Sequence, residues 1–224
     1  MVRLLVTTLI ALFAFGRAGA VSITTAQGLS HNGVTSIIED SRGYLWIATY
    51  EGLNRYNGKD FTLYRNSADS ASLLSNRVRA LCEDSRGRIW VGTESGVMLL
   101  DDAHNRFLQL KYDSSEFSNN LLIKGLASDS NDRIIAIAES GGVALFNLDG
   151  ELLAYDNREN VRFNSILAHT QNIFIITSDS GLWSYDSSTR EIKSIEVDGK
   201  EFNERIESIC TEIVVMGNNL RKKY

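Results

Sequence analysis

The sequence of 224 residues has no proline, two cysteines and three histidines. Proline is disfavoured inside paired strands, so its absence is compatible with a chain made mostly of β-sheet. His31, His104 and His169 are scattered, and none belongs to a metal-binding or nucleophile motif. Two cysteines with these histidines also lack the spacing of a zinc site. We therefore predict no cofactor, no metal site and no catalytic residue, so that the chain is not itself an enzyme.

Long apolar runs and an excess of basic charge are also missing. The run at residues 4–15 is shorter than the about 20 apolar residues that span a bilayer. It follows Arg3 and precedes the small residues 18–20, so residues 1–20 match a secretory signal peptide, with a membrane anchor as the alternative. Cleavage would remove Arg3, Arg17 and no acid, leaving 21 basic and 28 acidic side chains, a net charge of −7. We predict a periplasmic or otherwise extracytoplasmic protein, with no membrane span in the mature chain and no binding to nucleic acid.

The rest of the chain repeats one pattern. Residues 40–49 (DSRGYLWIAT) return 44 residues later as residues 84–93 (DSRGRIWVGT), and weaker copies follow at residues 129–138 and 173–182. A period of about 40 to 45 residues, built from short apolar strands and glycine turns, is typical of a β-propeller blade. We therefore predict an all-β fold, a β-propeller of four-stranded antiparallel blades with about four complete blades and a partial fifth.

This repeat predicts the domain boundaries. Two accounts of the partial fifth blade remain open: the chain is the N-terminal piece of a longer protein, or it closes on itself with residues 21–25 as an extra outer strand. The predicted segments are a signal peptide at 1–20 and propeller repeats at 21–224, with blades at about 30–66, 75–112, 121–157 and 162–198 and a partial blade at 205–224.

The most strongly repeated residues are predicted to build the scaffold. Asp in the Asp-Ser-Arg-Gly stretch can cap a turn with its side chain, and glycine there takes a positive φ. The tryptophans lie in all-apolar strands, which favours packing between blades over the alternative of a sugar-stacking platform. The residues assigned this structural role are Asp40, Gly43, Trp46, Gly52, Asp84, Gly87, Trp90, Gly96 and Gly141.

The two cysteines occupy the same place in different repeats. Cys82 follows Leu81 and Cys210 follows Ile209 on the inner strands of non-adjacent blades. Equivalent positions on such blades are farther apart than the about 7 Å between Cα atoms that a disulfide permits. We predict that both are small buried residues without a disulfide.

One face of the propeller is the predicted ligand surface. The turns between second and third strands gather there with the links between blades, and loops on a rigid scaffold often carry recognition. The alternative is that the turn merely tolerates the recurring acids. The predicted ligand-binding residues are Tyr50, Glu51, Arg77, Glu94, Ser95, Glu139 and Asp179, with His31, Asn32 and Asn76 at the blade entries.

The repeat resembles a known family. The run at residues 28–34 (GLSHNGV), followed by Asp-Ser-x-Gly-x-[Leu/Ile]-Trp-[Ile/Val]-[Ala/Gly]-Thr-x-x-Gly-[Leu/Val], is similar to the two-component regulator propeller repeat. That repeat occurs in the periplasmic sensor region of hybrid two-component histidine kinases of the Bacteroidetes type. The resemblance implies a seven-bladed propeller of which this chain is an N-terminal fragment.

The resemblance also implies a function. It suggests an extracytoplasmic ligand-sensing propeller that recognises an oligosaccharide and works with downstream signalling domains or a dimer partner. The kinase and the membrane segment of that family have no counterpart in this sequence. Two alternatives are a propeller enzyme of the streptogramin lyase type and a surface propeller that binds other proteins.

Overall fold

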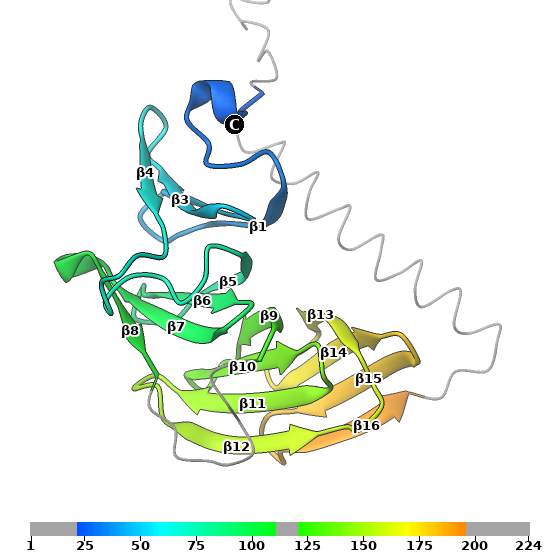
Figure 1. Cartoon of the computed structure of the whole chain (residues 1–224). Helices are drawn as coiled ribbons and strands as arrows, with labels where there is room; N and C mark the ends of the chain where they lie inside the picture. The colour runs from blue at the N-terminus through cyan, green and yellow to red at the C-terminus, as the bar shows by residue number, and fades with distance from the viewer. Residues whose placement is uncertain (1–21, 111–120, 196–224) are drawn as a thin grey trace, which may run out of the picture.

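The computed structural model describes residues 22–110 and 121–195, which form four antiparallel sheets (Figure 1). The first sheet contains β1 (Val34–Glu39), β2 (Leu45–Thr49), β3 (Gly52–Tyr56) and β4 (Phe61–Tyr64). The second contains β5 (Val78–Glu83), β6 (Ile89–Thr93), β7 (Gly96–Asp101) and β8 (Arg106–Gln109). The third contains β9 (Ile123–Ser128), β10 (Arg133–Ala138), β11 (Gly142–Asn147) and β12 (Leu152–Asn157). The fourth contains β13 (Phe163–Ala168), β14 (Ile173–Ser178), β15 (Gly181–Asp186) and β16 (Glu191–Ile195).

Each sheet is a meander whose strands pair in sequence order. The first strands β1, β5, β9 and β13 contact one another in succession, so they form the inner edge of the array. Two short 3₁₀ helices, η1 (Thr25–Gln27) and η2 (Asp102–His104), complete the described part of the chain. The predicted all-β propeller of four-stranded antiparallel blades is therefore confirmed. The predicted signal peptide (1–20) and partial fifth blade (205–224) lie outside the described residues, as does Cys210.

The Asp-Ser-Arg-Gly turns form as predicted. Asp40 Oδ1 accepts hydrogen bonds from the backbone N–H groups of Arg42 and Tyr44 at 2.9 and 3.0 Å. Gly43 follows with φ of 84°, which glycine adopts without the steric penalty that a Cβ imposes. Asp84 and Gly87 repeat this arrangement in the second blade. The shared turn explains why these residue types recur.

Both repeated tryptophans are fully buried between blades, which confirms their predicted role. Trp46 belongs to the apolar cluster that joins the first two blades and stacks on Tyr64 with ring centroids 5.9 Å apart. Trp90 lies in the next cluster, against Phe146 of the third blade. The indole therefore supplies both apolar volume and, through its N–H, a donor that needs a buried partner.

That partner is the turn aspartate of the same blade. Trp46 Nε1 donates to Asp40 Oδ2 and Trp90 Nε1 donates to Asp84 Oδ2, both at 2.9 Å. Burial opposes ionisation of Asp84, but hydrogen bonds from Trp90 and Arg88 outweigh it and hold the pKa of this carboxyl below its ordinary value. Each aspartate thus acts as a charged acceptor that fixes the tryptophan and the turn together.

One detail differs from expectation, and one agrees with it. Thr24 is the N-cap of η1 and Thr25 lies within it, so these residues do not supply the extra outer strand considered for residues 21–25. The cause is local, because Thr24 and Gln27 form a capping box that stabilises the helical turn. Cys82 is buried with a free thiol, and burial raises its pKa to about 11.

Candidate functional site

The four turns between second and third strands lie at equivalent places on one end of the blades. In each blade the first turn residue donates its backbone N–H to the carbonyl just before the inner strand, with distances between 2.8 and 3.3 Å. The same bond holds each turn beside the start of its inner strand. The side chains of the first turn residues therefore occupy equivalent positions in the four blades. The donor residues are Tyr50, Glu94, Glu139 and Asp179, all of which the sequence nominated as ligand-binding residues.

Every inner strand has a β-bulge next to this turn. The pairing register skips one residue between Val34 and Ser36, and the skip recurs at the start of β5, β9 and β13. A bulge takes a residue out of the regular pleat and re-aims its side chain. The bulged residues are Thr35, Arg79, Lys124 and Asn164. We call the four turn residues and the four bulged residues together the turn face.

Arg79 connects the first two blades on the turn face. Its Nε donates to Glu94 Oε1 at 3.0 Å, and its Nη2 donates to the same oxygen. The guanidinium also lies over the Tyr50 ring, 4.8 Å from the centroid, in cation–π geometry. Tyr50 remains 39% exposed, so an aromatic surface is open to solvent beside this ion pair.

Lys124 and Glu139 form the corresponding pair in the third blade, with Nζ and Oε1 2.9 Å apart. The hydrogen bond from Lys124 lowers the pKa of Glu139, and the charges of Arg162 and Arg79 add to the effect. Arg79 and Lys124 lie on β5 and β9, which contact each other, so the two ion pairs belong to adjacent inner strands. Glu139 is therefore ionised at neutral pH and acts as a fixed acceptor.

The remaining predicted residues have peripheral or local roles. Arg77 is largely exposed and reaches Glu94 at 3.5 Å. Asp179 Oδ1 accepts the backbone N–H of Arg162 at 3.0 Å. Glu51 and Ser95, the second turn residues, donate their backbone N–H groups to the hydroxyls of Thr49 and Thr93, two residues earlier at the ends of β2 and β6.

The blade-entry residues are mostly engaged within the fold. His31 Nδ1 accepts from the backbone of Gly33 at 2.8 Å, and its ring meets the Tyr50 ring edge-on. Asn32 and Asn76 use their side-chain oxygens to accept backbone N–H groups at 2.9 and 2.7 Å. The sequence analysis missed Arg79 and Lys124. Each directly follows the Val or Ile that opens an inner strand, but no residue type marks the bulge that re-aims its side chain.

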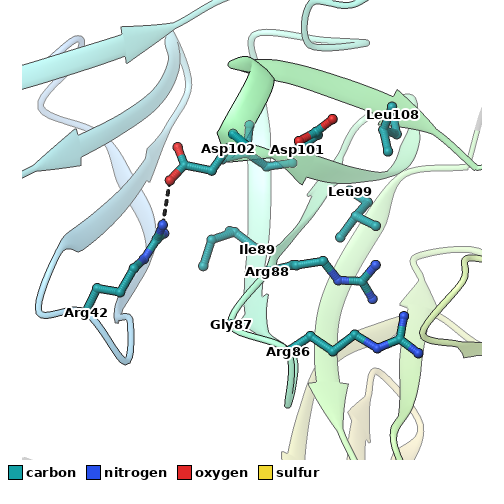
Figure 2. Close-up of a pocket in the computed structure, with 11 residues that line it drawn as sticks. Arg42, Arg86, Gly87, Arg88, Ile89, Leu99, Asp101, Asp102 and Leu108 are labelled. Atoms are coloured by element: carbon teal, nitrogen blue, oxygen red, sulfur yellow. Dashed lines mark hydrogen bonds and ion pairs between the residues drawn. The ribbon is translucent and has the colours of Figure 1, made fainter.

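A cavity of about 440 Å³ lies at the opposite ends of the first two blades. Figure 2 shows side chains that line it. Apolar side chains, including Leu99 and Leu108, line it together with arginines and η2. Arg42 bridges the buried Asp40 at 2.8 Å and Asp102 of the second blade at 2.6 Å.

Two further arginines of this cavity make similar links. Arg88 pairs with buried Asp84 at 2.7 Å and also donates to Leu148 O in the third blade. Arg86 reaches Asp149 of the same third blade at 2.9 Å. These arginines connect successive blades, so we assign them to the assembly of the propeller rather than to ligand binding.

Within residues 22–110 and 121–195, no group of three or more His, Cys, Asp and Glu side chains is placed to hold a metal ion. In the same ranges, no helix is long and apolar enough to cross a bilayer.

The fold and the repeated turns define a β-propeller of four-stranded blades. Residues 28–51 and 72–95 match the model of the two-component regulator propeller family, so these two stretches are similar to repeats of that family. Among curated proteins, Histidine kinase P4 from Formosa agariphila is 39% identical over 54 residues, which cover 24% of this chain and 4% of that protein. The chain thus matches only a small part of this relative.

Solved structures show the same fold at low sequence identity. The extracellular domain of a putative hybrid two-component system from B. thetaiotaomicron superposes with a TM-score of 0.66 and 21% identity, covering 79% of this chain and 26% of that one. Virginiamycin B lyase from Staphylococcus aureus gives a TM-score of 0.60 at 14% identity, covering 75% of this chain and 56% of the lyase. At these identities the similarity establishes architecture alone, because one fold hosts many functions.

Proposed function

We propose that this chain is the extracytoplasmic ligand-sensing propeller of a two-component signalling sensor, and that it binds an oligosaccharide on the turn face. The observation that carries the proposal is the group made by Tyr50, Arg79 and Glu94, with the pair of Lys124 and Glu139 on the adjacent blade. It combines an exposed aromatic ring with donors and acceptors whose positions are fixed by pairing. Sites of this kind bind polar ligands through a few well-placed groups on a rigid scaffold.

Tyr50 supplies the apolar part of the recognition. One side of its ring carries the Arg79 guanidinium, and the exposed part of the ring is free to pack against the C–H face of a sugar. Glu94 and Glu139 supply acceptors for hydroxyl groups, and Arg79 and Lys124 supply donors. Hydrogen bonds that involve a charged partner are stronger than neutral ones. These four charged side chains therefore favour the binding of a polyol.

The signalling part of the proposal rests on the family repeats. A bound saccharide would shift a conformational equilibrium in the sensor to the extent that it binds one state better than the other. The chain itself then acts by binding and is not an enzyme. Export through a signal peptide at residues 1–20 belongs to the same proposal, because the expected ligand lies outside the cytoplasm.

The test begins with a glycan array probed with the purified full chain, followed by calorimetry on any saccharide bound. The double variant Tyr50→Ala/Arg77→Ala removes the exposed ring of the turn face and the exposed cation that lies beside it against Glu94. We expect affinity to fall by about tenfold or more, as for loss of hydrogen bonds and stacking at a binding site.

A matched control removes similar groups from the other end of the blades. Arg86→Ala/Leu108→Ala deletes an exposed arginine and a side chain of the same exposed fraction, 38% against 39% for Tyr50. This control should bind as the wild type does. Equal affinities of wild type and Tyr50→Ala/Arg77→Ala would show that the turn face is not the site.

A further inference from the structure

The bulges place hydrogen-bond donors on the turn face, and the adjacent turns place acceptors. Thr35, the donor of the first blade, is already used, since its hydroxyl donates to Val78 O at 2.7 Å. Arg79 and Lys124 occupy the same bulge position in the next two blades. Each lies against the acid of its own turn, Glu94 or Glu139. The two central blades therefore present two donor–acceptor pairs of the same design.

These pairs are partly shielded from water. The side chains of Arg79 and Glu94 are 21% and 22% exposed, and those of Lys124 and Glu139 are 25% and 40% exposed. In such surroundings an added charge without a partner is costly, because it loses part of its hydration and gains no interaction that offsets the loss. A ligand with its own charge would have to displace one member of a pair.

The turn face also carries no cationic surplus. Its cations are Arg79 and Lys124, and its acids are Glu94, Glu139 and Asp179. This set therefore does not attract an acidic saccharide over long range.

We infer that the turn face takes an uncharged saccharide through a vicinal diol, and that Arg79 and Lys124 read this diol together with Glu94 and Glu139. This inference rests on the proposed function and names its ligand class. Each carboxylate accepts from one hydroxyl group of the diol, while the paired cation donates to the hydroxyl oxygens. A neutral diol thus forms hydrogen bonds with both members of an ion pair while the pair stays intact. An acidic sugar would have to displace one member of the pair.

The experiment compares paired probes with the full chain. Oligosaccharides of neutral hexoses are offered beside the hexuronic acid oligosaccharides of the same length and linkage, on an array and then by calorimetry. The wild type should prefer the neutral member of a pair by about tenfold or more, the scale of one unpaired polar group.

Two double variants test the roles of the named residues. Glu94→Gln/Glu139→Gln keeps the shape of both acids but leaves Arg79 and Lys124 without anionic partners, so the preference should turn toward the hexuronic acid member. Arg79→Gln/Lys124→Gln should weaken binding of the neutral member by about tenfold. The control Glu39→Gln/Glu191→Gln removes two acids away from the turn face and should leave the preference of the wild type unchanged.

The outcomes separate this inference from the proposed function. Preference of the wild type for the hexuronic acid series overturns the inference and leaves a saccharide sensor standing. If Glu94→Gln/Glu139→Gln keeps the wild-type preference for the neutral series, the inference is likewise overturned and a saccharide sensor is left standing. Failure of both series to bind overturns the proposed function and the inference with it. The single variant Glu139→Gln, at the more exposed of the two acids, serves where the double variant does not fold.

Discussion

Ser187 donates a hydrogen bond of 2.7 Å to Asp129 Oδ2 across the joint between the third and fourth blades. In the first two blades the equivalent oxygen is bound by an indole of the same blade, from Trp46 or Trp90. The third repeat has Ile135 at the tryptophan position, so the acceptor must be satisfied from elsewhere. A buried carboxylate left without donors would be costly, and the neighbouring blade supplies the missing one.

Ser187→Ala should therefore weaken the third joint. Ser187 is fully buried, and its removal leaves Asp129 Oδ2 with Arg133 as its side-chain partner. We expect the free energy of unfolding to fall by about 1 to 3 kcal/mol, the cost of a buried group that loses a hydrogen bond. Urea unfolding measures the change. Ser188→Ala, on the exposed neighbouring residue, should stay within about 0.5 kcal/mol, and equal losses for both serines would contradict the assignment.

Trp90→Ala should be more damaging, since it opens a cavity between the second and third blades. We expect a loss of about 3 to 5 kcal/mol in chemical denaturation. Trp90→Phe keeps much of the apolar contact with Phe146 but loses the Nε1 donor to Asp84, so its cost should be smaller, about 1 to 3 kcal/mol. A phenylalanine variant as unstable as the alanine variant would show that volume is not the main contribution of this residue.

The turn aspartates predict a dependence of stability on pH. The pKa of Asp84 is lowered from its ordinary value of 3.8, so the folded state binds this proton less readily than the unfolded state does. Its contribution is fully present above the ordinary value and is lost as the pH falls through the lowered one. Asp84→Asn should then destabilise the protein at pH 7 and make little difference in strong acid. Urea unfolding between pH 7 and pH 2, for wild type and variant, tests whether the two curves converge.

Arg86 and Arg88 offer a comparison of an exposed and a buried ion pair. Arg86 pairs with Asp149 at the surface, where both side chains are more than half exposed, so Arg86→Ala should change stability by less than about 0.5 kcal/mol. Arg88 holds the buried carboxylate of Asp84, and Arg88→Ala should cost about 1 to 3 kcal/mol. Thermal unfolding of the two variants side by side would reveal the difference, and equal midpoints would contradict it.

The fold could be predicted from the sequence because the repeat is local. Asp40 and Gly43 form their turn through hydrogen bonds within five residues, so the residue types alone indicate the conformation. Trp46 lies in a strand that is apolar throughout, and such a pattern indicates burial on both faces. The spacing of strands and turns within one repeat then predicts a four-stranded blade, and the recurrence of the repeat along the chain predicts a propeller.

The candidate site could be predicted only in part. The turn positions of Tyr50, Glu94 and Glu139 follow from the glycine turns, and the sequence therefore placed them on one face. The bulges that turn Arg79 and Lys124 toward these residues left no clear pattern, because a bulge shifts the register by one residue without changing the residue types.

Contacts between blades belong to the tertiary structure alone. The contact of Arg79 with Tyr50 and the bond of Ser187 to Asp129 join residues that are 29 and 58 positions apart. Their pairing depends on how each sheet twists and packs against the next one, which no local pattern specifies. The sequence by itself determined the blade, its turns and its buried strands, since these depend on neighbours in the chain. The packing of blade on blade decided which groups of different blades meet on the turn face, because that choice depends on the contacts between adjacent sheets.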